Sequence, residues 1–297
     1  NTKSINCEQQ LKITTLQDLE KIELDCAYNV KQKIGIRSLL YSDAASEKGN
    51  NVLSFKQHND KLLIDIGKKL LEGNKFSLII NYSTNGLIRP PPVRLPPKDD
   101  AMGFNFVLSD NNVAFQAWTQ GEPIASNKWF PCIDHPQDKF TRQISVIVPE
   151  NFVVISNGER DTIDQDVEGE RKKKYVWEES HPNTAYVTSV VIGEFAELPK
   201  ENYEGRVPLL YYVPRGREDD GRRLFKNTLS MMNFFETFFE TKYPFDKYSQ
   251  VTVDEFPHGG MENTTCTTLT TDDLPSEQVV RDNKIYDYVV VHELAHQ

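Results

Sequence analysis

The sequence is poor in cysteine, and its few thiols lie far apart. Its 297 residues contain four cysteines and no CxxC pair: Cys7, Cys26, Cys132 and Cys266. Four isolated cysteines are too few for a disulfide scaffold, and structural zinc sites use closely spaced pairs. We therefore expect free thiols in preference to a disulfide framework.

The sequence also lacks a long apolar run and an excess of positive charge. No segment approaches the roughly 20 apolar residues that a membrane-spanning helix needs. Lys and Arg total 34 against 44 Asp and Glu, which gives a net charge of -10. Such an acidic protein is a poor match for nucleic acid or for anionic lipid. We expect neither a membrane span nor a nucleic-acid partner, and the sequence leaves the oligomeric state open.

The first residue is Asn1, not methionine. A leader removed before this point would leave the same start, so the missing signal peptide is no argument about export. A cytoplasmic location is our working expectation.

What the sequence has is an alternation of apolar and polar residues. Residues 21–28 and 76–82 alternate with a period of two, which is typical of half-buried strands. Similar short runs, with turn residues between them, continue to about residue 213. A Pro-rich stretch, Arg89 to Asp100, interrupts them and is expected to form a surface loop. This pattern predicts an antiparallel β domain over residues 1–214.

Helical spacing replaces the alternation after Pro214. Apolar residues recur at this spacing from Leu224 to Phe239, and we expect their Met and Phe stripe to face a core. A strand at 250–253 and a glycine-containing loop precede a second helical run, from Ile285 to His296. We predict a fold that is mainly β plus α+β, with a second domain over residues 215–297.

The second helical run carries an HExxH motif made by His292, Glu293 and His296. The four-residue spacing places both imidazoles on one helix face, where they can bind one tetrahedral zinc ion. The apolar run before them predicts that the helix and its histidines are buried. Zinc lowers the pKa of a water molecule toward about 7, and Glu293 can accept the proton while hydroxide attacks a carbonyl. The motif predicts metal-assisted hydrolysis, with two ordinary helix histidines as the alternative.

A second group of residues lies in the loop upstream. Gly259 and Gly260 can bring backbone N–H and C=O groups close to an extended ligand, and Glu262 offers a carboxylate for an ammonium group. Taken alone, such a loop is also consistent with a plain turn. Together with the zinc motif, it predicts a peptide held by its amino end.

Three blocks resemble the gluzincin aminopeptidases, the family of aminopeptidase N and the leukotriene epoxide hydrolase. They are Thr119–Asp134, containing TQGE and WFPCID, then GGMEN at 259–263, then VHELAHQ at 291–297. The resemblance covers essentially the whole chain. It implies a saddle-like antiparallel β domain followed by the truncated start of a thermolysin-like catalytic domain.

The resemblance also implies a role for seven residues, all in zinc binding, catalysis or substrate binding. His292 and His296 would bind zinc, Glu293 would activate water, Glu262 would capture the α-amino group, Gln120 would line the pocket for the amine and first side chain, and Gly259 and Gly260 would contact the peptide backbone.

The implied function is a zinc aminopeptidase that releases N-terminal amino acids from peptides with a free N-terminus. In the family, a third zinc ligand follows the second histidine by about eighteen residues, whereas this chain ends at Gln297. We therefore expect a fragment with little or no activity of its own. A non-catalytic interaction module is the alternative from another functional class, and these residues leave the epoxide hydrolase branch open.

Overall fold

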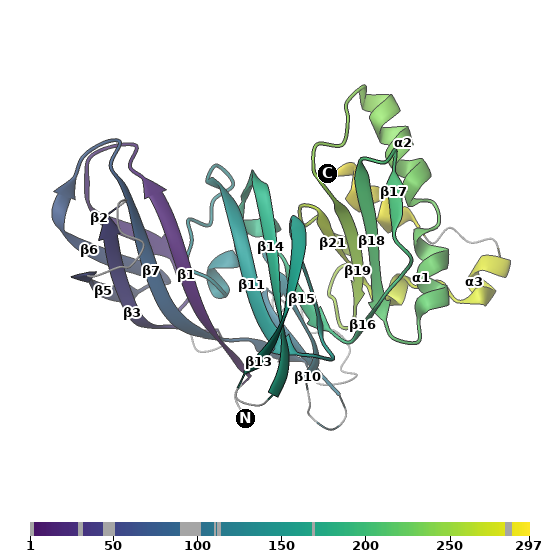
Figure 1. Cartoon of the computed structure of the whole chain (residues 1–297), viewed down its shortest axis with the longest axis horizontal. Coiled ribbons are helices and arrows are strands. Elements are labelled where there is room, and N and C mark those ends of the chain that lie inside the picture. Colours follow the sequence, from purple (N-terminus) through teal and green to yellow (C-terminus); the bar gives the residue numbers. More distant parts are fainter. Residues whose placement is uncertain are drawn as a thin grey trace.

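The computed structural model describes residues 3–28, 32–43, 51–89, 102–109, 111, 114–167, 170–282 and 287–297. In this part of the chain, β-rich N-terminal sheets lead into a mixed sheet flanked by helices (Figure 1). The predicted fold class, mainly β plus α+β, is confirmed.

Two antiparallel sheets form the N-terminal end. One has the order β1-β7-β3-β4 and the other the order β2-β6-β5. Phe76, Leu78, Ile80 and Tyr82 on the central strand β7 are all buried, which confirms the predicted alternation. The strands are β1 (Ser4–Thr14), β2 (Leu19–Asp25), β3 (Ile34–Asp43), β4 (Asn51–Val52), β5 (Ser54–His58), β6 (Lys61–Leu70) and β7 (Lys75–Asn85).

Two further sheets continue the β-rich part, with the orders β12-β15-β10-β9-β8 and β11-β14-β13. Their pairs are antiparallel except for β8 with β9. Apart from Arg89, the Pro-rich stretch lies outside the described residues. The elements are β8 (Leu87–Arg89), β9 (Gly103–Leu108), β10 (Ala114–Gln120), β11 (Lys139–Pro149), β12 (Val153–Ser156), β13 (Glu159–Val167), β14 (Glu170–Thr184) and β15 (Val190–Gly193), with the 3-10 turns η2 (Ser126–Lys128) and η3 (Ala185–Val187).

A mixed sheet follows, in which β18, β19 and β21 are parallel and β20 pairs antiparallel with β21. It includes strands on both sides of residue 214, where the predicted domain boundary stays a prediction. The elements are β16 (Phe195–Glu197), β17 (Glu201–Tyr203), β18 (Val207–Pro214), α1 (Glu218–Phe225), α2 (Thr228–Phe239), β19 (Tyr248–Val253), β20 (Gly260–Met261), β21 (Cys266–Thr270), η4 (Thr271–Asp273), α3 (Glu277–Arg281) and α4 (Tyr288–Ala295).

The Met and Phe stripe of α1 and α2 is buried only in part. Leu224 and Met232 are buried, as predicted for a core face. Phe238 and Phe239 are 67% and 58% exposed, so the prediction is wrong at the end of the stripe. The Phe238 ring lies outside the core and stacks on Phe234 of the same helix, with ring centres 5.6 Å apart. The core-facing side of α2 therefore ends before its last turn.

Buried and part-buried hydrogen bonds join the N-terminal sheets to the mixed sheet at both ends of β19; we call these contacts the β19 seam. Before β19, Lys247 Nζ donates to Ser156 O (2.7 Å). After β19, Gln116 Nε2 donates to Asp254 Oδ2 (2.9 Å), Asp254 N donates to Gln116 Oε1 (2.9 Å) and Trp118 Nε1 donates to Asp254 O (3.1 Å). The seam fixes β10 and β12 relative to β19.

Two expectations from composition can be compared with the structure. All four cysteines are free thiols, as predicted. Among the described residues, no helix combines the length and the apolar character needed to cross a bilayer.

Glu236 on α2 holds the turn that follows the helix. Its carboxylate accepts hydrogen bonds from Tyr243 N (2.7 Å), Lys242 Nζ (2.9 Å) and Arg206 Nη2. Burial alone would raise the pKa of Glu236, but these donors outweigh it and lower the pKa to about 2. A pKa lowered by folding stabilises the protein above the ordinary value of 4.5, and this contribution is lost as the pH falls from there toward 2.

We expect Glu236→Gln to lower the free energy of unfolding by about 1–2 kcal/mol at neutral pH, because solvent screens part of the ion-pair energy. The loss should become smaller as the pH falls below 4.5, because the wild-type carboxylate is then progressively protonated. Urea titrations of both proteins between neutral and acidic pH measure the difference. The control Glu240→Gln changes an exposed acid at the same helix end and should shift stability by less than about 0.5 kcal/mol throughout. A deficit that stayed constant across this range would contradict the ionic role.

Candidate active site

Helix α4 presents its HExxH residues on two different faces. Val290, Glu293 and Leu294 are buried where α4 packs against α2, β20 and β21. His292 and His296 are exposed, so the prediction that both histidines are buried is wrong. The reason is the helical period: the apolar run buries the face that carries Glu293, and the imidazoles project from another side.

The two imidazoles are nevertheless paired. The Nε2 atoms of His292 and His296 lie 3.3 Å apart. Two nitrogens that each bind one tetrahedral zinc ion at 2.0–2.1 Å would be separated by roughly 3.3–3.4 Å. The separation of the two nitrogens therefore matches that of two ligands on one zinc ion.

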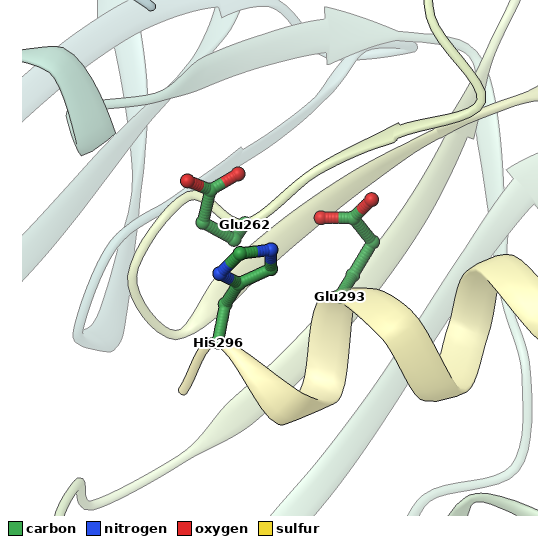
Figure 2. A group of neighbouring side chains, drawn as sticks. All are labelled: Glu262, Glu293 and His296. Atoms are coloured by element: carbon green, nitrogen blue, oxygen red, sulfur yellow. The ribbon is translucent and has the colours of Figure 1, made fainter.

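Glu262 joins these residues from the loop that follows β20. Figure 2 shows Glu293 and His296 on α4 with Glu262 beside them. One ligand atom from each of the three side chains lies within 4.8 Å of those of the other two. The loop and the helix are thus brought together, as the two sequence motifs require.

The site is electrostatically poised for a cation. Glu293 is 4% exposed, and its Oε2 atom has no hydrogen-bond partner among the described residues. Burial, and after it the charges of Glu262 and Glu122, raise the pKa of Glu293 to about 8. A cation near these carboxylates would lower that pKa, because an opposite charge favours the ionised form. A metal ion and an ammonium group are both cations that would lower the pKa of Glu293 in this way.

Gly260 makes room for the Glu293 carboxylate. A Cβ atom added at Gly260 would lie 2.4 Å from Glu293 Oε1, much closer than any ordinary contact. The same addition at Gly259 would meet Val289 at 3.3 Å, a tight contact. Contact of these glycines with a peptide backbone stays a prediction. The structure adds a second reason for glycine at 260, which is the close approach of Glu293.

Gln120 reaches the loop from the N-terminal sheets. It ends β10, is fully buried, and donates from Nε2 to Met261 Sδ at 3.4 Å. Its Oε1 atom has no partner within the described part of the chain. Gln120 therefore lies beside the GGMEN segment, residues 259–263, although it is far from this segment in sequence.

Two residues near the site had no role in the sequence analysis. Glu122 contributes to the raised pKa of Glu293, and burial followed by the charges of Glu262 and Glu122 raises the pKa of Tyr186. Glu122 belongs to the TQGE block, so its position two residues after Gln120 could have indicated that this acid lies near the site. Tyr186 had no such signal, because the turn η3 brings it near the loop.

Two family models match most of this chain. A family model for the Peptidase M1 N-terminal domain matches residues 1–187, and a model for the Peptidase family M1 domain matches residues 224–297. The predicted boundary at residue 214 falls between the two matches.

Similar curated proteins are aminopeptidases. Glutamyl aminopeptidase of Rattus norvegicus is 29% identical over 187 residues, which cover 61% of this chain and 19% of the relative. Probable aminopeptidase 1 of Saccharolobus solfataricus is 33% identical over 184 residues, covering 60% and 23%. Aminopeptidase M1 of Arabidopsis thaliana is 29% identical over 212 residues, covering 66% and 24%.

The matched part of the chain thus spans between 19% and 24% of the length of these relatives. The first family model covers well over half of the chain, and the second covers the segment that carries both motifs of the site. The chain belongs to the peptidase M1 family.

Proposed function

We propose that the protein carrying this chain is a zinc-dependent aminopeptidase that releases amino acids from peptides with a free N-terminus. The observation that carries the proposal is the approach of Glu262 to Glu293 and His296, with ligand atoms within 4.8 Å of one another. An acid suited to an ammonium group therefore lies beside the helix suited to a metal. Membership of the peptidase M1 family supports the proposal. A cytoplasmic location stays a prediction.

His292 and His296 are the residues that would hold zinc, and their Nε2 separation of 3.3 Å supports this assignment. Zinc, when bound, supplies a Lewis acid for a carbonyl oxygen and acidifies a water molecule. Catalytic zinc sites normally have three protein ligands, whereas this pair provides two. We therefore propose that the 297-residue chain by itself has little or no turnover.

The protein's own side chains divide the remaining work. Glu262 binds the substrate ammonium group by charge, with Glu122 adding to the negative potential. Because the first peptide bond is only one residue from that ammonium group, binding at Glu262 places the bond near Glu293. The Oε2 atom of Glu293 accepts a proton from the attacking water and passes it to the leaving nitrogen. Gln120 and Gly259 border the substrate.

The amine-binding role of Glu262 is tested by Glu262→Ala in the protein expressed from its complete gene. We expect kcat/KM for an aminoacyl amide to fall by roughly 10²-fold, because the variant loses the charge partner of a desolvated ammonium group. The same substrates with a blocked amine should be affected by no more than about twofold. Steady-state kinetics on both series measure the contrast.

The control is Glu277→Ala, which removes an exposed acid on α3 and should leave both series unchanged. Equal losses on free and blocked substrates in Glu262→Ala would show that Glu262 does not recognise the amine.

A further inference from the structure

Gln297 links the end of the HExxH helix to both sides of the Glu262 loop. It directly follows His296, and its carboxamide makes two hydrogen bonds across the site. Gln297 Nε2 donates to Glu262 O (3.0 Å), and Thr265 N donates to Gln297 Oε1 (2.8 Å). One side chain therefore spans residues 262–265 and ties them to α4.

Thr265, the other end of this span, has an unusual backbone. Its φ is 60°, in the left-handed region that β-branched residues rarely adopt. Such a conformation is strained and persists only where neighbouring contacts hold it. The Thr265 hydroxyl accepts from Gly158 N (2.7 Å), in the bend between β12 and β13, and donates to Glu179 Oε2 (3.4 Å) on β14. The loop is thus held from the helix and from the sheets at once.

Asn157 adds to this support through its side chain. Asn157 Nδ2 donates to Thr264 O (2.6 Å), while Ser189 N donates to Asn157 Oδ1 (2.8 Å). The residues just after Glu262 are therefore held through Asn157, which directly follows β12, and through Ser189, which directly precedes β15. None of these contacts uses the Glu262 carboxylate itself, which stays available to a ligand.

We propose that Gln297 and Thr265 are positioning residues that set where the Glu262 carboxylate lies relative to α4. The inference rests on the proposed function, because it takes the amine-binding role of Glu262 from there. Gln297 fixes the backbone from which the Glu262 side chain projects, and Thr265 locks the turn that follows. A displacement of about 1 Å at such a group can cost roughly 10²-fold in rate. Gln297 and Thr265 therefore act on substrate through the position of Glu262, without touching substrate themselves.

The test uses two neutral substitutions in the protein expressed from its complete gene. Gln297→Met keeps the length of the side chain and removes both hydrogen bonds. Thr265→Val keeps the β-branched shape and removes the hydroxyl. The control Gln278→Met makes the same change on exposed α3, where the Gln278 side chain donates to Asp282 directly after the helix.

The readouts are binding constants from ligand-observed NMR titrations, with zinc content per chain measured in parallel. The probes are leucinamide and 4-methylpentanamide, which is the same molecule without its amine. Because leucinamide is itself an aminoacyl amide, every protein in these titrations also carries Glu293→Gln, which keeps turnover negligible. In Gln297→Met and Thr265→Val we expect the Kd of leucinamide to rise roughly three- to tenfold, the effect of a lost hydrogen bond. The Kd of 4-methylpentanamide should change by less than about twofold, and zinc content should be unchanged.

An unchanged Kd for leucinamide, or an equal rise for both probes, would overturn the positioning role. Loss of zinc from Gln297→Met would also overturn it, because the residue would then act through His296. Binding is measured without turnover, so failure of the proposed function appears separately, as a wild-type protein that binds leucinamide but hydrolyses no aminoacyl amide.

Discussion

Glu293→Gln is expected to lower kcat for an aminoacyl amide by roughly 10³-fold while zinc stays bound. Glutamine has nearly the same shape, so it preserves the contact with Gly260, where an added Cβ would lie 2.4 Å from Glu293 Oε1. It cannot accept the water proton, because its amide has no basic oxygen at neutral pH. Steady-state kinetics and zinc analysis of the protein expressed from its complete gene measure both quantities.

The KM of this variant should stay within about threefold of the wild-type value, since the ammonium group is held by Glu262. The matched control is Glu277→Gln, an exposed acid on α3 whose loss should not change kcat. A Glu293→Gln variant that kept a tenth or more of wild-type kcat would mean that another group accepts the proton.

Replacing either histidine of the pair is expected to remove the metal. Their Nε2 atoms lie 3.3 Å apart, so we expect each to supply one ligand to a shared zinc ion, and loss of either would leave a single imidazole. We expect His292→Ala and His296→Ala to retain less than about a tenth of the wild-type zinc after dialysis, and to lose activity by roughly 10³-fold or more. Metal analysis and kinetics are made on the same samples.

The comparison of these two variants also distinguishes two arrangements of ligands. Glu262, Glu293 and His296 form a close group of their own that omits His292. If that group held the metal, His292→Ala would keep its zinc and only His296→Ala would lose it. His58→Ala, at an exposed position on β5, serves as the control and should keep both zinc and activity.

Local patterns predicted much of the fold. The alternation at 76–82 predicted a strand with one buried face. Strand β7, which lies between β1 and β3, buries Phe76, Leu78, Ile80 and Tyr82 on one face. The HExxH spacing placed both histidines one helical turn apart, which accounts for their close approach. Such features depend on backbone periodicity, which the sequence carries directly.

Features that depend on distant contacts could not be predicted in this way. The exposure of His292 follows from which face of α4 packs on the sheet. The contact of Gln120 with Met261 joins positions 141 residues apart. The need for glycine at 260 appears only once Glu293 lies against it. In each case the decisive neighbour belongs to another element, and periodicity says nothing about which elements meet.

The β19 seam holds two parts of the candidate site in place. Bonds at both ends of β19, through Lys247 and Asp254, hold the N-terminal sheets against the mixed sheet. Gln120 and the GGMEN loop lie on either side of this junction and are already in contact. Because these contacts hold the two parts of the site together, a peptide bound as proposed above would meet a wall that is already formed, and its binding would cost less conformational entropy. The binding energy of the amino end is then available to orient the peptide bond at Glu293.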